Sequence, residues 1–220
     1  MINIRNFCDS HLLCKVLHGE GVDVKVAASS KILFLNAFVL SSSRCPVDDG
    51  TLYHFAKHVL PSAIFWGTDW MDHSEANICH NAPCVTALLQ LVFTLLTRGK
   101  RFGCLLECNG HSDLSLEQKI RKVHGWALKA VRIKGCSDKS IENHSLMELR
   151  LAGLKIMLAI IAITKISDEQ CFGRYFGPDM LVETFAVLRM ANTDKNKNIN
   201  TLAGHILKGL QQAIHISKDI

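Results

Sequence analysis

The side chains best suited to chemistry are cysteines and histidines in the first half of the chain. Cys79 and Cys84 form one close pair, and Cys104 and Cys108 form another further along. Zinc takes four thiolate or imidazole ligands, commonly supplied as two close pairs. The spacings are not those of a standard zinc knuckle, however, and Cys104 lies inside an apolar run. We therefore interpret these residues as core cysteines, keep a zinc site as the alternative, and expect no cofactor.

Patterns typical of the common catalytic sites are missing from the sequence. Residues 98–101, Arg-Gly-Lys-Arg, lack the upstream glycine of a phosphate-binding loop, and neither Gly-x-Gly-x-x-Gly nor Gly-x-Ser-x-Gly occurs. Asp69, Asp72, His73 and Glu75 gather acid and base groups in one segment, but acidic loops of this kind are usually just solvated. We expect a protein that is not an enzyme.

A basic surface is predicted between residues 98 and 134. At helical spacing, one face of residues 115–134 is apolar, and the segment carries a local charge of +5, which equals the formal charge of the whole chain. The candidate binding residues are Arg98, Lys100, Arg101, Arg121, Lys122, Lys129 and Arg132. Such a face suits an acidic peptide or the phosphates of nucleic acid, although a solvated helix face is commoner. Trp126, at the border of the apolar face, is interpreted as core.

Composition favours a folded protein with reduced thiols. The 220 residues are 48% hydrophobic and 20% charged, enough for a substantial core and unlike a disordered chain. The number of cysteines, 9, is odd, and the N-terminal residues do not resemble a secretory signal. The most apolar stretch, residues 151–163, is interrupted by Lys155 and is too short to span a bilayer. We expect a protein of the cytoplasm or nucleus, with no membrane association.

Helix start and stop signals predict a single helical domain over residues 1–220. Its parts are a looser N-terminal region (1–66), a connection (67–82) and a helical core (83–220). In the core, Ser145 and Glu148 form a capping box that predicts a helix start, and Gly177-Pro178-Asp179 predicts another. The predicted helices are residues 4–17, 25–40, 46–60, 83–97, 115–134, 145–166, 178–190 and 199 to near the end, with a polar linker at 192–198.

Three apolar helical runs follow one another in the second half of the chain. They are residues 146–161 (LMELRLAGLKIMLAII), 179–185 (DMLVETF) and 200–207 (NTLAGHIL). In this order of long helix, short turn and next helix, residues 84–218 resemble armadillo- and HEAT-like helical repeat proteins. The resemblance implies an all-α fold, either an irregular α-solenoid or a multi-helix bundle, that binds other proteins without catalysing a reaction.

Alternatives to this interpretation remain open. Alternating Val22, Val24 and Val26, with a buried strand at residues 32–40, would fit an α/β fold. The weak match of the first 80 residues would fit a fragment or isoform of a longer protein. The leading functional prediction is an interaction scaffold for a partner protein with an acidic surface. A nucleic-acid-associated protein using the surface from Arg98 to Lys134, and a zinc protein or enzyme built on residues 69–111, are the alternatives.

Overall fold

The computed structural model describes residues 71, 74–98, 116–133, 142–167 and 176–216, and every regular element within them is α-helix. The helices are α5 (Glu75–His80), α6 (Ala82–Arg98), α8 (Leu116–Arg132), α9 (Glu142–Ser167), α11 (Pro178–Asn192) and α12 (Lys197–Ile216). The all-α prediction is thereby confirmed for this part of the chain. The strand candidates at residues 22–26 and 32–40, and the predicted helices before residue 61, lie outside the described residues.

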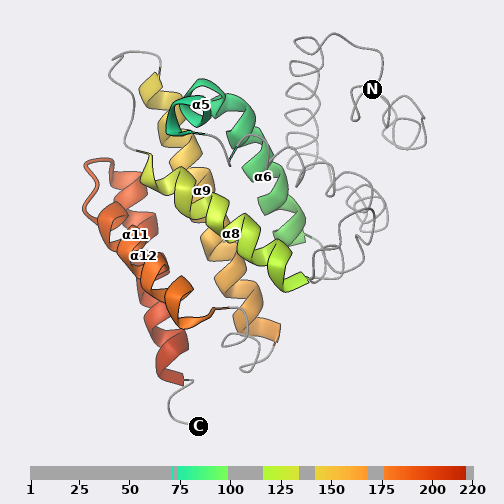
Figure 1. Cartoon of the computed structure of the whole chain (residues 1–220). Helices are drawn as coiled ribbons and strands as arrows, with labels where there is room; N and C mark the ends of the chain where they lie inside the picture. Colours follow the sequence, from blue (N-terminus) through green and yellow to red (C-terminus); the bar gives the residue numbers. More distant parts are fainter. Residues whose placement is uncertain (1–70, 72–73, 99–115, 134–141, 168–175, 217–220) are drawn as a thin grey trace, which may run out of the picture.

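Helix α9 occupies the centre of the described region. It packs against α6, α8 and α12, while α11 packs against both α8 and α12 (Figure 1). A continuous cluster of buried side chains joins these helices, with Leu88 of α6, Trp126 of α8, Leu154 of α9 and Ile206 of α12 among its members. Because α9 has neighbours on several sides, it is apolar around most of its circumference, as the sequence of residues 151–163 predicts.

Helices α8 and α9 approach each other closely at Gly153. A Cβ atom placed on Gly153 would lie 2.8 Å from the carbonyl oxygen of Ala127 and 3.1 Å from the Cβ of Ala130. Small residues on both helices thus bring the two backbones together. This contact fixes how α8, which carries most of the predicted basic residues, sits on the centre of the molecule.

Two local predictions differ from the structure. Helix α9 begins at Glu142, so Ser145 lies inside its first turns and the predicted capping box is wrong. The connection at residues 67–82 contains helix α5, whose six residues are too few to show an apolar stripe in the sequence. Both helices flanking the predicted polar linker do occur, since α11 ends at Asn192 and α12 begins at Lys197.

Helix α6 is also largely apolar and buried. Val85, Leu88, Leu89, Leu91 and Val92 are all fully buried, as expected for a helix that is apolar on most of its faces. Among the described helices, none combines the length and the apolar character needed to cross a membrane.

Candidate functional site

Helix α8 separates apolar and basic side chains as its sequence predicts. Ile120, Val123 and Ala127 are buried against the core, and Arg121 and Arg132 are exposed. The 3.6-residue period explains this division, because residues three and four apart share a face. Four of the candidate cations, Arg121, Lys122, Lys129 and Arg132, therefore belong to one helix whose opposite face is anchored in the core.

Lys122 is half-buried and lies over an aromatic ring. Its Nζ is 6.0 Å from the centre of the Trp126 ring, at the outer limit of a cation–π contact. Only 2% of Trp126 is exposed, which confirms that this residue belongs to the core. The buried indole has no free face on which a nucleotide base could stack, so α8 offers a charged surface without an aromatic platform.

Lys129 and Arg132 connect α8 to other parts of the fold. The Lys129 Nζ donates a hydrogen bond to the Met71 carbonyl oxygen at 2.9 Å. Arg132 Nη2 lies 2.9 Å from Glu183 Oε1 of α11, in an ion pair whose side chains are 47% and 45% exposed. Exposed pairs of this kind contribute at most about 1 kcal/mol. These two cations therefore have structural contacts that the sequence did not reveal.

The remaining basic residues of the predicted surface are placed differently. Lys119 of α8 is only 3% exposed, so its charge belongs to the interior rather than to the surface. The Arg98 side chain, like Lys100 and Arg101, lies outside the described residues. The structure thus brings together the four cations of α8 and leaves the upstream three as predictions.

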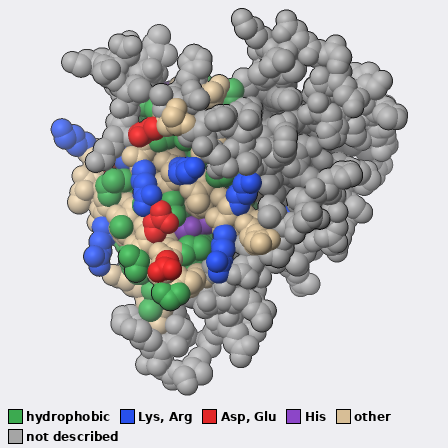
Figure 2. All heavy atoms as spheres, in the orientation of Figure 1, with side chains coloured by type: hydrophobic (Ala, Val, Ile, Leu, Met, Phe, Trp, Pro, Cys, Tyr) green, Lys and Arg blue, Asp and Glu red, His purple; other side chains and the backbone are tan. Residues whose placement is uncertain are grey.

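Charges of both signs are mixed on the visible face of the described helices. Figure 2 shows lysine and arginine side chains interspersed with acidic and apolar ones, not gathered into one unbroken basic area. Exposed Asp179 and Glu183 of α11 belong to the described surface, and Glu183 directly neutralises Arg132. A surface with charges of both signs favours a protein partner whose own charges are complementary to them. It is less suited to a uniformly negative polymer.

A buried histidine connects α8 to α11. His124 Nε2 lies 3.2 Å from Thr184 Oγ1, and the imidazole meets the Phe176 ring edge-on at 5.5 Å between centroids. The Thr184 hydroxyl donates its one hydrogen to the Met180 carbonyl at 2.6 Å, so its oxygen accepts from a neutral Nε2–H tautomer of His124. Burial lowers the pKa of His124 to about 4. The imidazole is therefore a neutral packing and hydrogen-bonding group at pH 7.

The candidate zinc ligands fall only partly within the described residues. Cys79 of α5 is buried and Cys84 of α6 is half-buried, both as free thiols, whereas Cys104 and Cys108 lie outside. Burial raises the pKa of the Cys84 thiol, an effect that a backbone N–H partly opposes. Among the described residues, no three cysteine, histidine or acidic side chains are grouped closely enough to hold a metal.

The candidate acid and base groups also fall only partly within the described residues. Asp69, Asp72 and His73 lie outside them, and Glu75 is the exposed first residue of α5.

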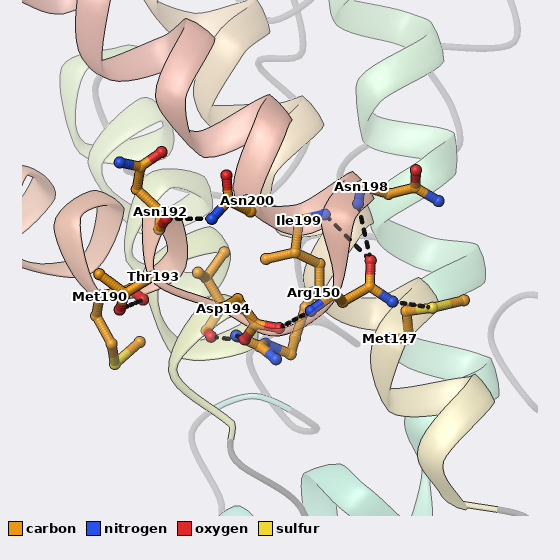
Figure 3. Close-up of polar contacts among 11 residues, drawn as sticks. Met147, Arg150, Met190, Asn192, Thr193, Asp194, Asn198, Ile199 and Asn200 are labelled. Carbon is orange, nitrogen blue, oxygen red and sulfur yellow. Dashed lines mark hydrogen bonds and ion pairs between the residues drawn. The ribbon is translucent and has the colours of Figure 1, made fainter.

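A polar cluster that the sequence did not predict lies where α9 meets the start of α12 (Figure 3). Arg150 of α9 donates from Nε to the Val131 carbonyl at 3.1 Å and from Nη2 to Asp194 Oδ2 at 2.5 Å. Partial burial works to raise the pKa of Asp194, but the Asn196 backbone N–H and Arg150 outweigh it and lower the pKa. The cluster thus holds the α11–α12 connection against α8 and α9.

Asn196 is the N-cap of α12. Its side-chain oxygen accepts from the backbone N–H groups of Asn198 at 3.0 Å and Ile199 at 3.3 Å. Asn196 N in turn donates to Asp194 Oδ1 at 2.8 Å. The signal was present in the sequence, because an asparagine three residues before a buried isoleucine is a typical helix start.

Comparison of the chain with models of protein families, with curated proteins and with solved structures gave no match.

Proposed function

We propose that this chain is a non-enzymatic interaction module built on stacked, armadillo- or HEAT-like helix pairs. The observation that carries the proposal is the order of helix contacts. Consecutive α8 and α9 form one pair and consecutive α11 and α12 another, while α8 contacts α11 and α9 contacts α12. In helical repeat proteins the first helices of neighbouring repeats pack on each other, and so do the second helices. This layering builds an extended binding surface.

The partner is another protein with acidic side chains, bound at the exposed face of α8. Arg121 is exposed and Lys122 half-exposed there, on a helix whose opposite face is fixed in the core. Lys129 and Arg132, with their contacts to Met71 and Glu183, hold this helix in place as well as adding charge. The mixed signs around α8 suit a protein surface with its own charge pattern.

A pair of charge-reversed double variants tests this proposal. Arg121→Glu/Lys122→Glu reverses two neighbouring cations on the outer face of α8. Lys155→Glu/Lys208→Glu makes the same charge change at exposed positions on α9 and α12. The intact chain and both variants are tagged, purified from cells with their bound proteins, and compared by quantitative mass spectrometry. We expect the α8 variant to lose at least one specific partner by about tenfold or more, while the control keeps it.

Two outcomes would contradict the proposal. If both variants retain every partner of the intact chain, the α8 face is not the binding surface. If the purified chain binds nucleic acid with an affinity that falls steeply as salt rises, counterion release identifies a phosphate backbone as the partner instead. Circular dichroism of both variants verifies that the helices are intact.

A further inference from the structure

A surface pocket lies beside the polar cluster, where the end of α8, the first turns of α9 and the start of α12 meet. Its volume is about 320 Å³, and Ile133, Leu146 and Ile199 form its apolar wall. This volume is at the lower end of the range for small-ligand sites. The polar side of the pocket is formed by Arg150, Asn196 and His144.

Arg150 lines the pocket and has more hydrogen-bond donors than its contacts within the fold use. A guanidinium carries five N–H donors, and the two bonds to Val131 and Asp194 use two of them. Among the described residues, the other Arg150 donors have no protein partner. The single carboxylate on Arg150 leaves room for a second acceptor on the same planar group.

Asn196 adds a donor with a weak partner. The amide oxygen is used to cap α12, but the amide Nδ2 donates only to the Met147 sulfur, at 2.8 Å. A thioether is a weak acceptor, so an oxygen ligand would improve this hydrogen bond. The pocket therefore offers donors from two side chains, and the N-terminal turns of α9 and α12 add positive partial charge.

We propose that this pocket binds the carboxylate of a compact organic acid with a branched hydrocarbon tail. The carboxylate accepts from Arg150 and from Asn196 Nδ2, and the tail lies against Ile133, Leu146 and Ile199. Inorganic phosphate would satisfy the donors but has no hydrocarbon part to contact the apolar wall. The donors of the pocket, Arg150 and Asn196, belong to α9 and to the start of α12, whereas the proposed partner surface is tested by variants of α8, so this proposal and the proposed function can fail separately.

The probe for this site is 4-methylpentanoate, titrated into the full chain by calorimetry. We expect a dissociation constant on the order of 1 mM, as for ligands of so few atoms. The neutral amide 4-methylpentanamide has the same shape and should bind about tenfold more weakly, because a charge-assisted hydrogen bond is lost. No heat of binding from the acid, or equal affinity for acid and amide, would overturn the proposal.

Asn196→Asp provides the matched variant. Aspartate caps a helix as well as asparagine does, so α12 stays intact, but the variant loses the amide donor and puts a negative charge into the pocket. We expect its affinity for 4-methylpentanoate to fall at least about tenfold. Asn198→Asp adds the same charge to the same helix turn at an exposed residue outside the pocket, and its affinity should change less than about threefold. Equal losses in the two variants would show that the acid binds elsewhere.

A carboxylate of this kind occurs both on free acids and at the C-terminus of a peptide ending in leucine. A pentapeptide ending in leucine is therefore titrated with a free and with an amidated C-terminus. Tighter binding of the free-terminus peptide than of 4-methylpentanoate identifies a chain terminus as the ligand, and weaker binding identifies a small acid. If neither 4-methylpentanoate nor the peptide binds the wild type more tightly than Asn196→Asp, the proposal is wrong.

Discussion

At the scale of single residues, His124 couples the packing of α8 and α11 to pH. Its imidazole is 1% exposed, donates to Thr184 and packs on Phe176. Burial disfavours the charged form, which is why the pKa falls to about 4 from 6.5. Between these two values the unfolded chain binds a proton that the folded chain does not, so acid favours unfolding.

We predict that the free energy of unfolding falls by about 2 kcal/mol between pH 7 and pH 5 through His124 alone. The stabilisation is complete above pH 6.5 and is lost progressively as the pH approaches 4. Urea unfolding at a series of pH values, monitored by circular dichroism, measures the slope. His124→Gln should remove this component, because glutamine does not titrate.

The control is His205→Gln, at an exposed histidine of α12. It should retain the full pH dependence of the wild type. A His124→Gln slope equal to that of His205→Gln would show that the buried imidazole does not titrate as inferred.

At the scale of helix pairs, Gly153 decides how closely α8 and α9 approach. In an open helix position, replacing glycine by alanine stabilises by about 1 kcal/mol. At Gly153 the added methyl would lie 2.8 Å from the Ala127 carbonyl, a backbone atom that cannot move without shifting α8. We predict that Gly153→Ala lowers the free energy of unfolding by about 1–3 kcal/mol despite its higher helix propensity. Thermal and urea unfolding measure the change.

Gly209→Ala is the matched control within α12. Nothing lies within 4 Å of the added methyl, so we expect this variant to be stabilised by about 0.5–1 kcal/mol. If the two substitutions change stability in the same direction and by the same amount, the close contact between α8 and α9 is absent in solution.

The sequence predicted the long helices because their signals are local. Gly177-Pro178-Asp179 places the start of α11 at Pro178, and the apolar stripe identifies α8 to within two residues at its ends. The Ser145–Glu148 pattern gave a wrong helix start, because the same spacing of serine and glutamate also occurs inside helices. Whether Ser145 caps the helix depends on the backbone conformation of the residues before it. Helix α5 was missed because its six residues hold too little of a periodic pattern.

Contacts within the candidate sites were harder to predict, since they join residues far apart in sequence. Lys129 and Met71 are separated by 58 positions, and Arg150 and Asp194 by 44. Helical spacing placed Lys129 on the polar face of α8 correctly but could not reveal a carbonyl partner supplied by another segment. The pocket beside Arg150 could not be predicted either, because its lining residues come from segments far apart in the sequence, at the end of α8, in α9 and at the start of α12.

At the scale of the whole molecule, one apolar cluster joins all the described helices through α9. Leu154 and Ile156 of α9 are fully buried, and so are other members of the cluster, such as Leu88 in α6, Val131 in α8 and Leu210 in α12. Packing of α6, α8 and α12 against α9 and burial of this cluster are thus the same structural event. Disturbing the centre of α9 should therefore affect every pair at once, unlike a change at the outer surface.

We predict that Leu154→Asp prevents stable folding. The carboxylate would lie in the centre of the cluster, where a buried charge costs several kcal/mol, comparable to the whole stability of a domain. Lys197→Asp is the control, because Lys197 is the exposed first residue of α12, where an acidic side chain suits the helix dipole. It should change the free energy of unfolding by about 0.5 kcal/mol or less. Circular dichroism melting curves compare the two, and equal melting temperatures would show that α9 does not form the centre of the core.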